Sequence, residues 1–139
     1  MRYLFYYTLF FTFNFAQFDW QDDGAPIRQG LHIEWQRTGD ANSDGSMIYA
    51  WSDCRNNGVR DVIAQKVDVG GNNLWGDNGV VAVKAEGRQE DPQLVTDGDG
   101  GAYIIWMDYR DETDAEGDIY AQHVLSDGSL DWPLEGYAL

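Results

Sequence analysis

An internal repeat runs through this chain: two sequence segments occur twice and a third occurs three times. The segment 47–55 aligns with 102–110, and both contain W-x-D-x-R. The segment 61–67 aligns with 118–124, and both contain D-x-x-A-Q-x-V. A tryptophan followed by glycine at the fourth position after it forms a third element, which occurs at Trp20, Trp75 and Trp132. A period of some tens of residues is typical of architectures in which equivalent units stack on one another.

Each period has the pattern of β-structure throughout. Short runs rich in β-branched and aromatic residues are separated by Gly, Asn and Asp clusters, which supply the positive φ angles of tight hairpins. The helical spacing of apolar residues is not sustained anywhere, so the sequence predicts an all-β fold. The run 103–107 is apolar at every position, which predicts a strand covered on both faces. The expected strands of the first period are 33–37, 47–53, 61–68 and 80–84.

Four short antiparallel strands per period, with Trp and Gly at fixed offsets, are typical of a β-propeller blade. We expect 17–29 to be the last-strand element of a blade, 30–85 to be a first blade repeat and 86–139 a second. Propellers contain about four to eight blades, so two blades do not close a ring. The sequence therefore predicts an incomplete or oligomer-completed β-propeller, and its expected partners are other blades of the same or another chain.

Three segments carry a resemblance to a known group of repeats. The runs D-G-D-G-G-A-Y-I-I-W-M-D-Y-R (97–110), G-D-I-Y-A-Q-H-V (117–124) and D-G-S-L-D-W (127–132) resemble the β-propeller-like tandem repeats of large secreted bacterial proteins, which often end in a Por-type secretion sorting domain. The resemblance covers 20–139. It implies propeller-like blades, and repeats of this kind mostly lack an assigned activity.

Residues 1–16 have the layout of a secretory signal peptide. One arginine is followed by a short apolar stretch and then by Ala16, a small residue at the expected cleavage site. The apolar stretch is shorter than the roughly 20 residues that a membrane-spanning helix needs. We therefore expect a protein that is secreted or exposed on the cell surface, without membrane insertion.

The charge balance excludes two classes of partner. The chain has 24 acidic and 9 basic residues, a formal net charge of −15. Such a charge repels the phosphates of nucleic acids and anionic lipid headgroups, and no basic cluster offsets it locally. The expected partners beyond other blades are glycans or cell-surface proteins.

Polar residues that recur in both periods are predicted to be structural. A catalytic group is normally needed once, whereas Asp53-x-Arg55 recurs as Asp108-x-Arg110 and Gln65 recurs as Gln122. We expect ion pairs from the first motif and bonds to backbone groups from the glutamines. No G-x-S-x-G, H-E-x-x-H or P-loop pattern is present, so the sequence predicts a protein that is not an enzyme.

Calcium is the candidate cofactor. The spacing Asp40-x-Asn42-x-Asp44-Gly matches the opening of a calcium loop, in which alternating oxygen ligands wrap a hard cation. A second acidic group could also gather a cation, and the alternative for both segments is a solvated acidic loop. The second group includes Asp111, Asp114 and Asp118.

Two functions remain open at this stage. The first is a non-enzymatic extracellular binding or structural module, expected to be a fragment of a longer propeller. The alternative is a homo-oligomeric, lectin-like propeller that binds carbohydrate. Trp75 and Trp132 lie next to predicted turns and could stack on sugars, although tryptophan at repeated positions also serves as blade core.

Overall fold

The computed structural model describes residues 24–28, 34–56, 58–111 and 116–139, so the predicted signal peptide lies outside the described residues. Within these ranges the chain forms no helix and two four-stranded antiparallel sheets, which confirms the all-β prediction. The strand orders are β1-β2-β3-β4 in the first sheet and β5-β6-β7-β8 in the second. The strands are β1 (Glu34–Ala41), β2 (Met47–Asn56), β3 (Val59–Val67), β4 (Val80–Val81), β5 (Gln89–Thr96), β6 (Ala102–Asp108), β7 (Asp118–Val124) and β8 (Tyr137–Ala138).

The two sheets repeat each other down to their irregularities. The β1–β2 pairing shifts register after Trp35, and the β5–β6 pairing shifts after Glu90, the equivalent position of the second repeat. Next to these shifts, Gln36 (φ 47°) and Asp91 (φ 53°) adopt the left-handed conformation that non-glycine residues rarely take. Of the element predicted at 17–29, only 24–28 is described, and those residues form no strand.

The Asp-x-Arg motif closes the end of the second strand of each sheet. In both copies the aspartate is buried and accepts bonds from a tryptophan indole, at 3.0 and 2.9 Å, and from an arginine guanidinium, at 2.7 Å. The guanidinium also reaches a backbone carbonyl in the loop before the last strand, at 2.7 Å. These contacts confirm the predicted structural ion pairs. The residues are Trp51, Asp53 and Arg55 in the first sheet and Trp106, Asp108 and Arg110 in the second.

The repeated glutamines also have the predicted role. Each is fully buried, accepts a bond from a tryptophan backbone N–H and donates to the backbone carbonyl of the residue after that tryptophan. Because a buried backbone group without a partner is costly, this one side chain fixes the irregular loop that leads to the edge strand. The sets are Gln65 with Trp75 and Gly76, and Gln122 with Trp132 and Pro133.

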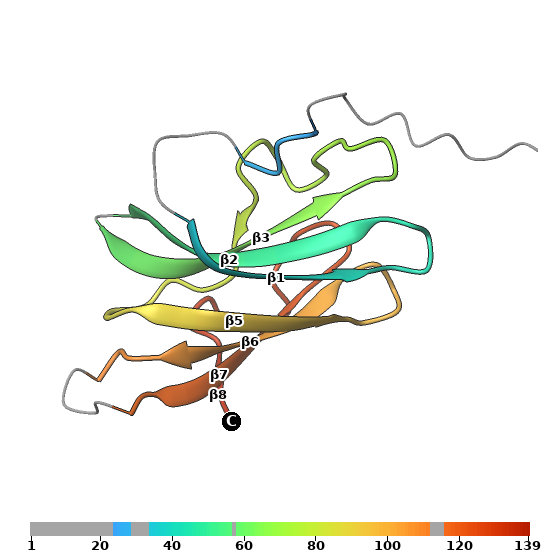
Figure 1. Ribbon diagram of the computed structural model, residues 1–139. Helices are drawn as coiled ribbons and strands as arrows, with labels where there is room; N and C mark the ends of the chain where they lie inside the picture. The colour runs from blue at the N-terminus through green and yellow to red at the C-terminus, as the bar shows by residue number, and fades with distance from the viewer. Residues whose placement is uncertain (1–23, 29–33, 57, 112–115) are drawn as a thin grey trace, which may run out of the picture.

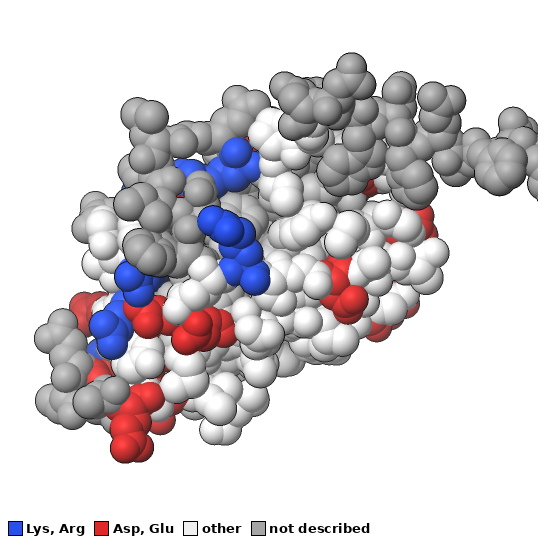
Figure 2. Space-filling view, viewed as in Figure 1, with Lys and Arg blue, Asp and Glu red and all other residues white. Residues whose placement is uncertain are grey.

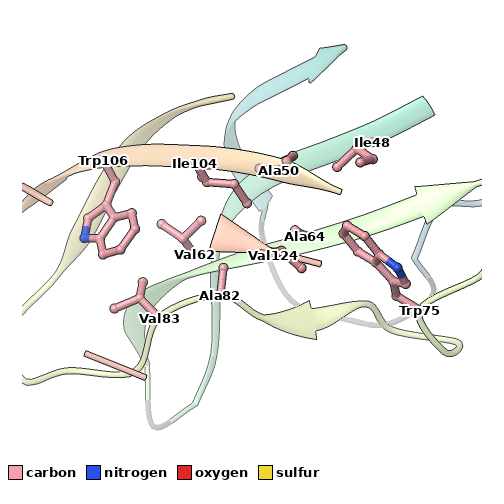
Figure 3. Packing of buried hydrophobic residues seen from close by; sticks show 11 residues of the cluster. Ile48, Ala50, Val62, Ala64, Trp75, Ala82, Val83, Ile104, Trp106 and Val124 are labelled. Atoms are coloured by element: carbon pink, nitrogen blue, oxygen red, sulfur yellow. The ribbon is translucent and has the colours of Figure 1, made fainter. Parts of the chain in front are cut away.

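The core lies between the two sheets. The first sheet contributes one set of alternating side chains, among them Ile48 and Ala50, and the second contributes Ile104 and Trp106. Figure 3 shows Trp106 and Trp75 at opposite ends of this cluster, with small and branched side chains between them. The contacts join opposite faces, because Ile48 and Ala50 are the repeat counterparts of Tyr103 and Ile105, which point away from the core. One face of the first sheet therefore packs against the opposite face of the second sheet, and we call this arrangement head-to-tail stacking.

Polar contacts connect the same two faces. The Asp40 carboxylate accepts bonds from the Thr96 backbone N–H at 3.0 Å and from its hydroxyl at 3.2 Å, where β1 runs beside β5 (Figure 1). The Lys66 ammonium donates to the Gly100 carbonyl at 2.9 Å. The interface between the sheets thus combines an apolar centre with hydrogen bonds at its margin.

Trp75 shows how closely the turns of the second sheet approach the first. Its indole N–H donates to the Ser126 carbonyl at 3.1 Å. Gly128 has φ +87°, and a Cβ placed there would lie 2.9 Å from the indole ring, so this turn requires glycine.

Candidate functional site

One face of the second sheet exposes large apolar side chains from all four of its strands. In the strand register, Val95 pairs with Tyr103. Ile105 pairs with Ala121, which in turn pairs with Tyr137, so these side chains share a face. We call this surface the open face of the second sheet. Its members and exposed fractions are Val95 (56%), Tyr103 (42%), Ile105 (39%), Ile119 (48%) and Tyr137 (53%).

The open face corrects one prediction. The strand expected at 103–107 is present as part of β6, but it is covered on one face only. Ile104 and Trp106 are buried, whereas Tyr103 and Ile105 are more than one third exposed. An apolar residue at every position predicts two covered faces, and within the described segments nothing lies over the second one.

The repeat counterparts of the open face are buried in the first sheet. Tyr103 corresponds to Ile48, Ile105 to Ala50 and Ile119 to Val62, and each of these three counterparts is 0% exposed. In the first sheet this face packs against the second sheet. The open face of the second sheet therefore corresponds to the covered face of the first sheet, but no neighbouring sheet packs against it among the described residues.

An aromatic cluster occupies one end of the open face. The Tyr103 and His123 rings stack with centroids 4.2 Å apart, and Trp132 lies 6.0 Å from Tyr103 and 5.6 Å from Tyr137. Trp132 is tilted relative to Tyr103 and Tyr137, so the partly exposed rings form an amphipathic cluster and not one flat stack. Such a cluster suits a partner with apolar and hydrogen-bonding groups side by side.

His123 connects this cluster to two carboxylates. Its Nε2 lies 2.9 Å from Asp97 Oδ2, and its Nδ1 lies 3.1 Å from Asp131 Oδ2. Burial acts to lower the pKa of His123, but the bonds to Asp97 and Asp131 outweigh it and raise the pKa above its usual value. Because both ring nitrogens face acceptors, the geometry favours the imidazolium, which donates at both positions.

The two tryptophans predicted as sugar-binding residues occupy different environments. Trp75 is only 5% exposed, because the second sheet covers it, so neither face of its indole is available to a ligand. Trp132 is half-buried in the aromatic cluster of the open face. Equivalent positions in the two repeats thus have different accessibility, and only Trp132 remains a candidate.

The residues of the predicted calcium loop have other partners. Asp40 bonds to Thr96 across the sheet interface, and Asp44 accepts bonds from the Ser46 backbone N–H and hydroxyl at 2.8 and 2.6 Å. Asn42 is buried and donates to the Ser46 hydroxyl at 3.1 Å. Among the described residues, no group of three or more His, Cys, Asp or Glu side chains is placed to hold a metal ion. Calcium binding here stays a prediction.

The second acidic group is described only in part. Asp111 and Asp118 are found on the two sides of 112–115, and Asp114 lies outside the described residues. Asp118 is the first residue of β7 and pairs with Asp108 in register. The described members of this group bring no ligand set together.

Several residues of the open face, and the two carboxylates beside His123, carry no distinctive signal in the sequence. Tyr103 and Tyr137 occur in strand patterns that also suit a core, and Asp97 and Asp131 occur in turns of an acidic chain. His123 has the clearest signal, because it interrupts the repeat where the first copy has Lys66.

Charged groups gather elsewhere on the surface. Figure 2 shows basic and acidic side chains next to one another on the side where β1 and β5 lie, with a broad uncharged surface beside them. At the sheet interface, Glu90 pairs with both Arg60 and Arg88.

The described segments contain no helix with the length and hydrophobicity to cross a membrane.

Comparisons of this chain with protein-family models, with curated proteins and with solved structures found no match. The function therefore has to be inferred from the residues and geometry of the chain itself.

Proposed function

We propose that this protein is a secreted, non-enzymatic module of β-propeller type, which acts outside the cell by binding or structural association through its sheet faces. The observation that carries the proposal is the head-to-tail stacking of two equivalent sheets. A stack of this kind can continue, because the second sheet has a face equivalent to the one that the first sheet buries, and the first sheet has a face equivalent to the one that the second sheet buries. In a propeller, that continuation closes into a ring.

The distribution of polar residues supports a role without catalysis. Asp53 and Asp108 each bond to an arginine and a tryptophan, and both glutamines bond to the backbone. These buried polar groups therefore have structural partners in both copies. The open face has aromatic and aliphatic groups, which suit association.

Export from the cytoplasm tests the extracellular part of this proposal. We expect the full chain, expressed in a bacterial host with a C-terminal tag, to be recovered outside the cytoplasm with a new N-terminus at Gln17. The matched control is the chain that lacks 2–16, which we expect to stay in the cytoplasm because the apolar segment is missing. Cell fractionation and N-terminal sequencing measure both outcomes. An uncleaved full chain confined to the cytoplasm would contradict the proposal.

Carbohydrate binding is the second candidate function, and the aromatic cluster favours it. Trp132 lies beside Tyr103 and Tyr137, and the exposed carboxylate of Asp131 is within the same group. Aromatic rings next to hydrogen-bonding groups are the elements that sugar recognition uses.

Tryptophan fluorescence during sugar titration tests this second function. If the cluster binds a sugar, titration changes the emission of the native chain, and Trp132→Phe removes most of that change. Trp75→Phe is the matched control and leaves the change in place, because Trp75 is buried between the sheets. An emission change that survives Trp132→Phe, or no change with any sugar of a broad panel, argues against carbohydrate binding at this cluster.

A further inference from the structure

We propose that the open face of the second sheet binds the first sheet of a second copy of this chain, head to tail, in the arrangement that the two sheets already have within one chain. This inference rests on the proposed function and names the partner of its binding surface. The template is the interface inside the chain, where one face of the first sheet covers the opposite face of the second.

The incoming sheet has the matching apolar surface. In the interface within the chain, the second sheet presents Ile104 and Trp106, whose counterparts in the first sheet are Tyr49 and Trp51. Tyr49 and Trp51 lie on the face of the first sheet that is turned away from the core, where Tyr49 is partly buried and Trp51 is only 4% exposed beside residues 24–28, so docking requires this segment to move. A second copy can therefore present a tyrosine and a tryptophan where the chain's own second sheet presents an isoleucine and a tryptophan.

The contact between β1 and β5 changes from polar to apolar when the interface within the chain is compared with the proposed interface between copies. Within the chain, Asp40 faces Thr96, and the two form a polar contact. In the proposed contact between copies, Val95 takes the place of Asp40 and Ala41 takes the place of Thr96. A polar pair is thus replaced by an apolar pair, and Val95 and Ala41 are both exposed in the single chain. Burial of both would remove apolar surface from water.

Residues 24–28 determine what must move when the copies dock. They lie on the first sheet, where Ala25 and Ile27 line a hollow of about 280 Å³ with Tyr49 and Trp51. In the Trp-Gly element, Ala25 is the counterpart of Tyr137, so an incoming segment 24–28 would take the place of β8 beside β7. β8 pairs with β7 through two residue pairs, and Leu139 adds one backbone bond to Ile119, so the proposal includes exchange of this short edge segment.

Disulfide trapping between two single-cysteine chains tests the arrangement. Cys54 is the only cysteine, so both chains carry Cys54→Ser, and one adds Ala41→Cys while the other adds Val95→Cys. Mixing the two under mild oxidation is expected to give a covalent dimer. Each chain oxidised alone gives little dimer, because head-to-tail docking does not bring two copies of one position together. The Asp40→Cys/Thr96→Cys chain is the positive control, because its cysteines lie at the equivalent contact within one chain.

A substitution on the open face tests which surface is responsible. Ile105→Asp in the Val95→Cys chain is expected to reduce trapping at least tenfold. The matched control is Leu74→Asp, which introduces the same charge at a residue 49% exposed and outside the open face. Its repeat counterpart is already Asp131, so the position accepts aspartate. Light scattering of the untrapped chain reports association without a covalent bond, which we expect to be lost with Ile105→Asp and retained with Leu74→Asp.

Three results would overturn the inference. The first is the absence of a mixed dimer while the positive control forms its internal disulfide. The second is a dominant dimer of the Val95→Cys chain alone, which would mean that two open faces meet each other. The third is trapping that Ile105→Asp leaves unchanged. None of these results bears on export or on cleavage after residue 16. The proposed docking can therefore fail while the proposed extracellular role holds, and the reverse.

Discussion

Replacement of Ile104 by alanine is expected to lower the free energy of unfolding by about 2–5 kcal/mol. Ile104 is 0% exposed and lies in the cluster between the two sheets, so its loss leaves a cavity at the interface (Figure 3). Because the interface holds the two sheets together, the loss weakens both repeats at once. Urea denaturation followed by tryptophan fluorescence measures the change, at a concentration where the chain is monomeric.

The neighbouring residue provides the control for this experiment. Ile105→Ala changes the same side chain on the same strand, but Ile105 is 39% exposed on the open face. We expect it to lower the free energy of unfolding by about 1 kcal/mol or less. Equal losses from the two substitutions would mean that β6 is covered on both sides and that the open face does not exist in solution.

Replacement of Asp108 by alanine is expected to cost about 3 kcal/mol, at the lower end of the range for breaking a buried ion pair. The carboxylate is 2% exposed and is bonded to the Arg110 guanidinium and the Trp106 indole. Without it, the Trp106 indole loses its acceptor and the Arg110 guanidinium keeps its bond to the Glu135 carbonyl, while the partial exposure of Arg110 lets water solvate its charge. Thermal or urea denaturation measures the loss. Asp127→Ala is the control, and we expect a much smaller effect, because Asp127 only bonds within its own exposed turn.

The dependence on pH separates an ion pair from packing. Burial acts to raise the pKa of Asp108, but bonds from Arg110 and Trp106 outweigh it and hold the pKa below the ordinary value of 3.8. The stabilisation is therefore fully present above pH 3.8 and is lost as the pH falls through the lower folded-state pKa. The difference in stability between the native chain and Asp108→Ala should shrink in this acid range. A difference that stays constant down to the acid transition would assign the effect to packing.

Much of the fold could be predicted because its signals are local. Turn residues, alternating strand patterns and the absence of helical spacing are properties of neighbouring residues, and they determine the all-β structure with four strands in each period. The structural roles of Asp53 and Gln65 followed from their recurrence, because a polar residue needed in every unit serves the unit and not a single site.

The site was harder to predict because exposure depends on what lies opposite each residue. Trp75 and Trp132 belong to the same sequence motif, yet one is covered by the second sheet and the other lies on the open face. His123 acquires its role from Asp97, which is far from it in sequence and near it only in the folded sheet.

The sequence by itself therefore determined the repeat, the strands and the polar anchors of each sheet, since these arise from spacing along the chain. Only the tertiary structure decided which faces are buried. Ile104 and Ile105 are adjacent and identical in chemistry, and they differ because strand geometry turns them to opposite faces. One of those faces meets the other sheet and the second does not, and burial is a property of that meeting and not of the residue.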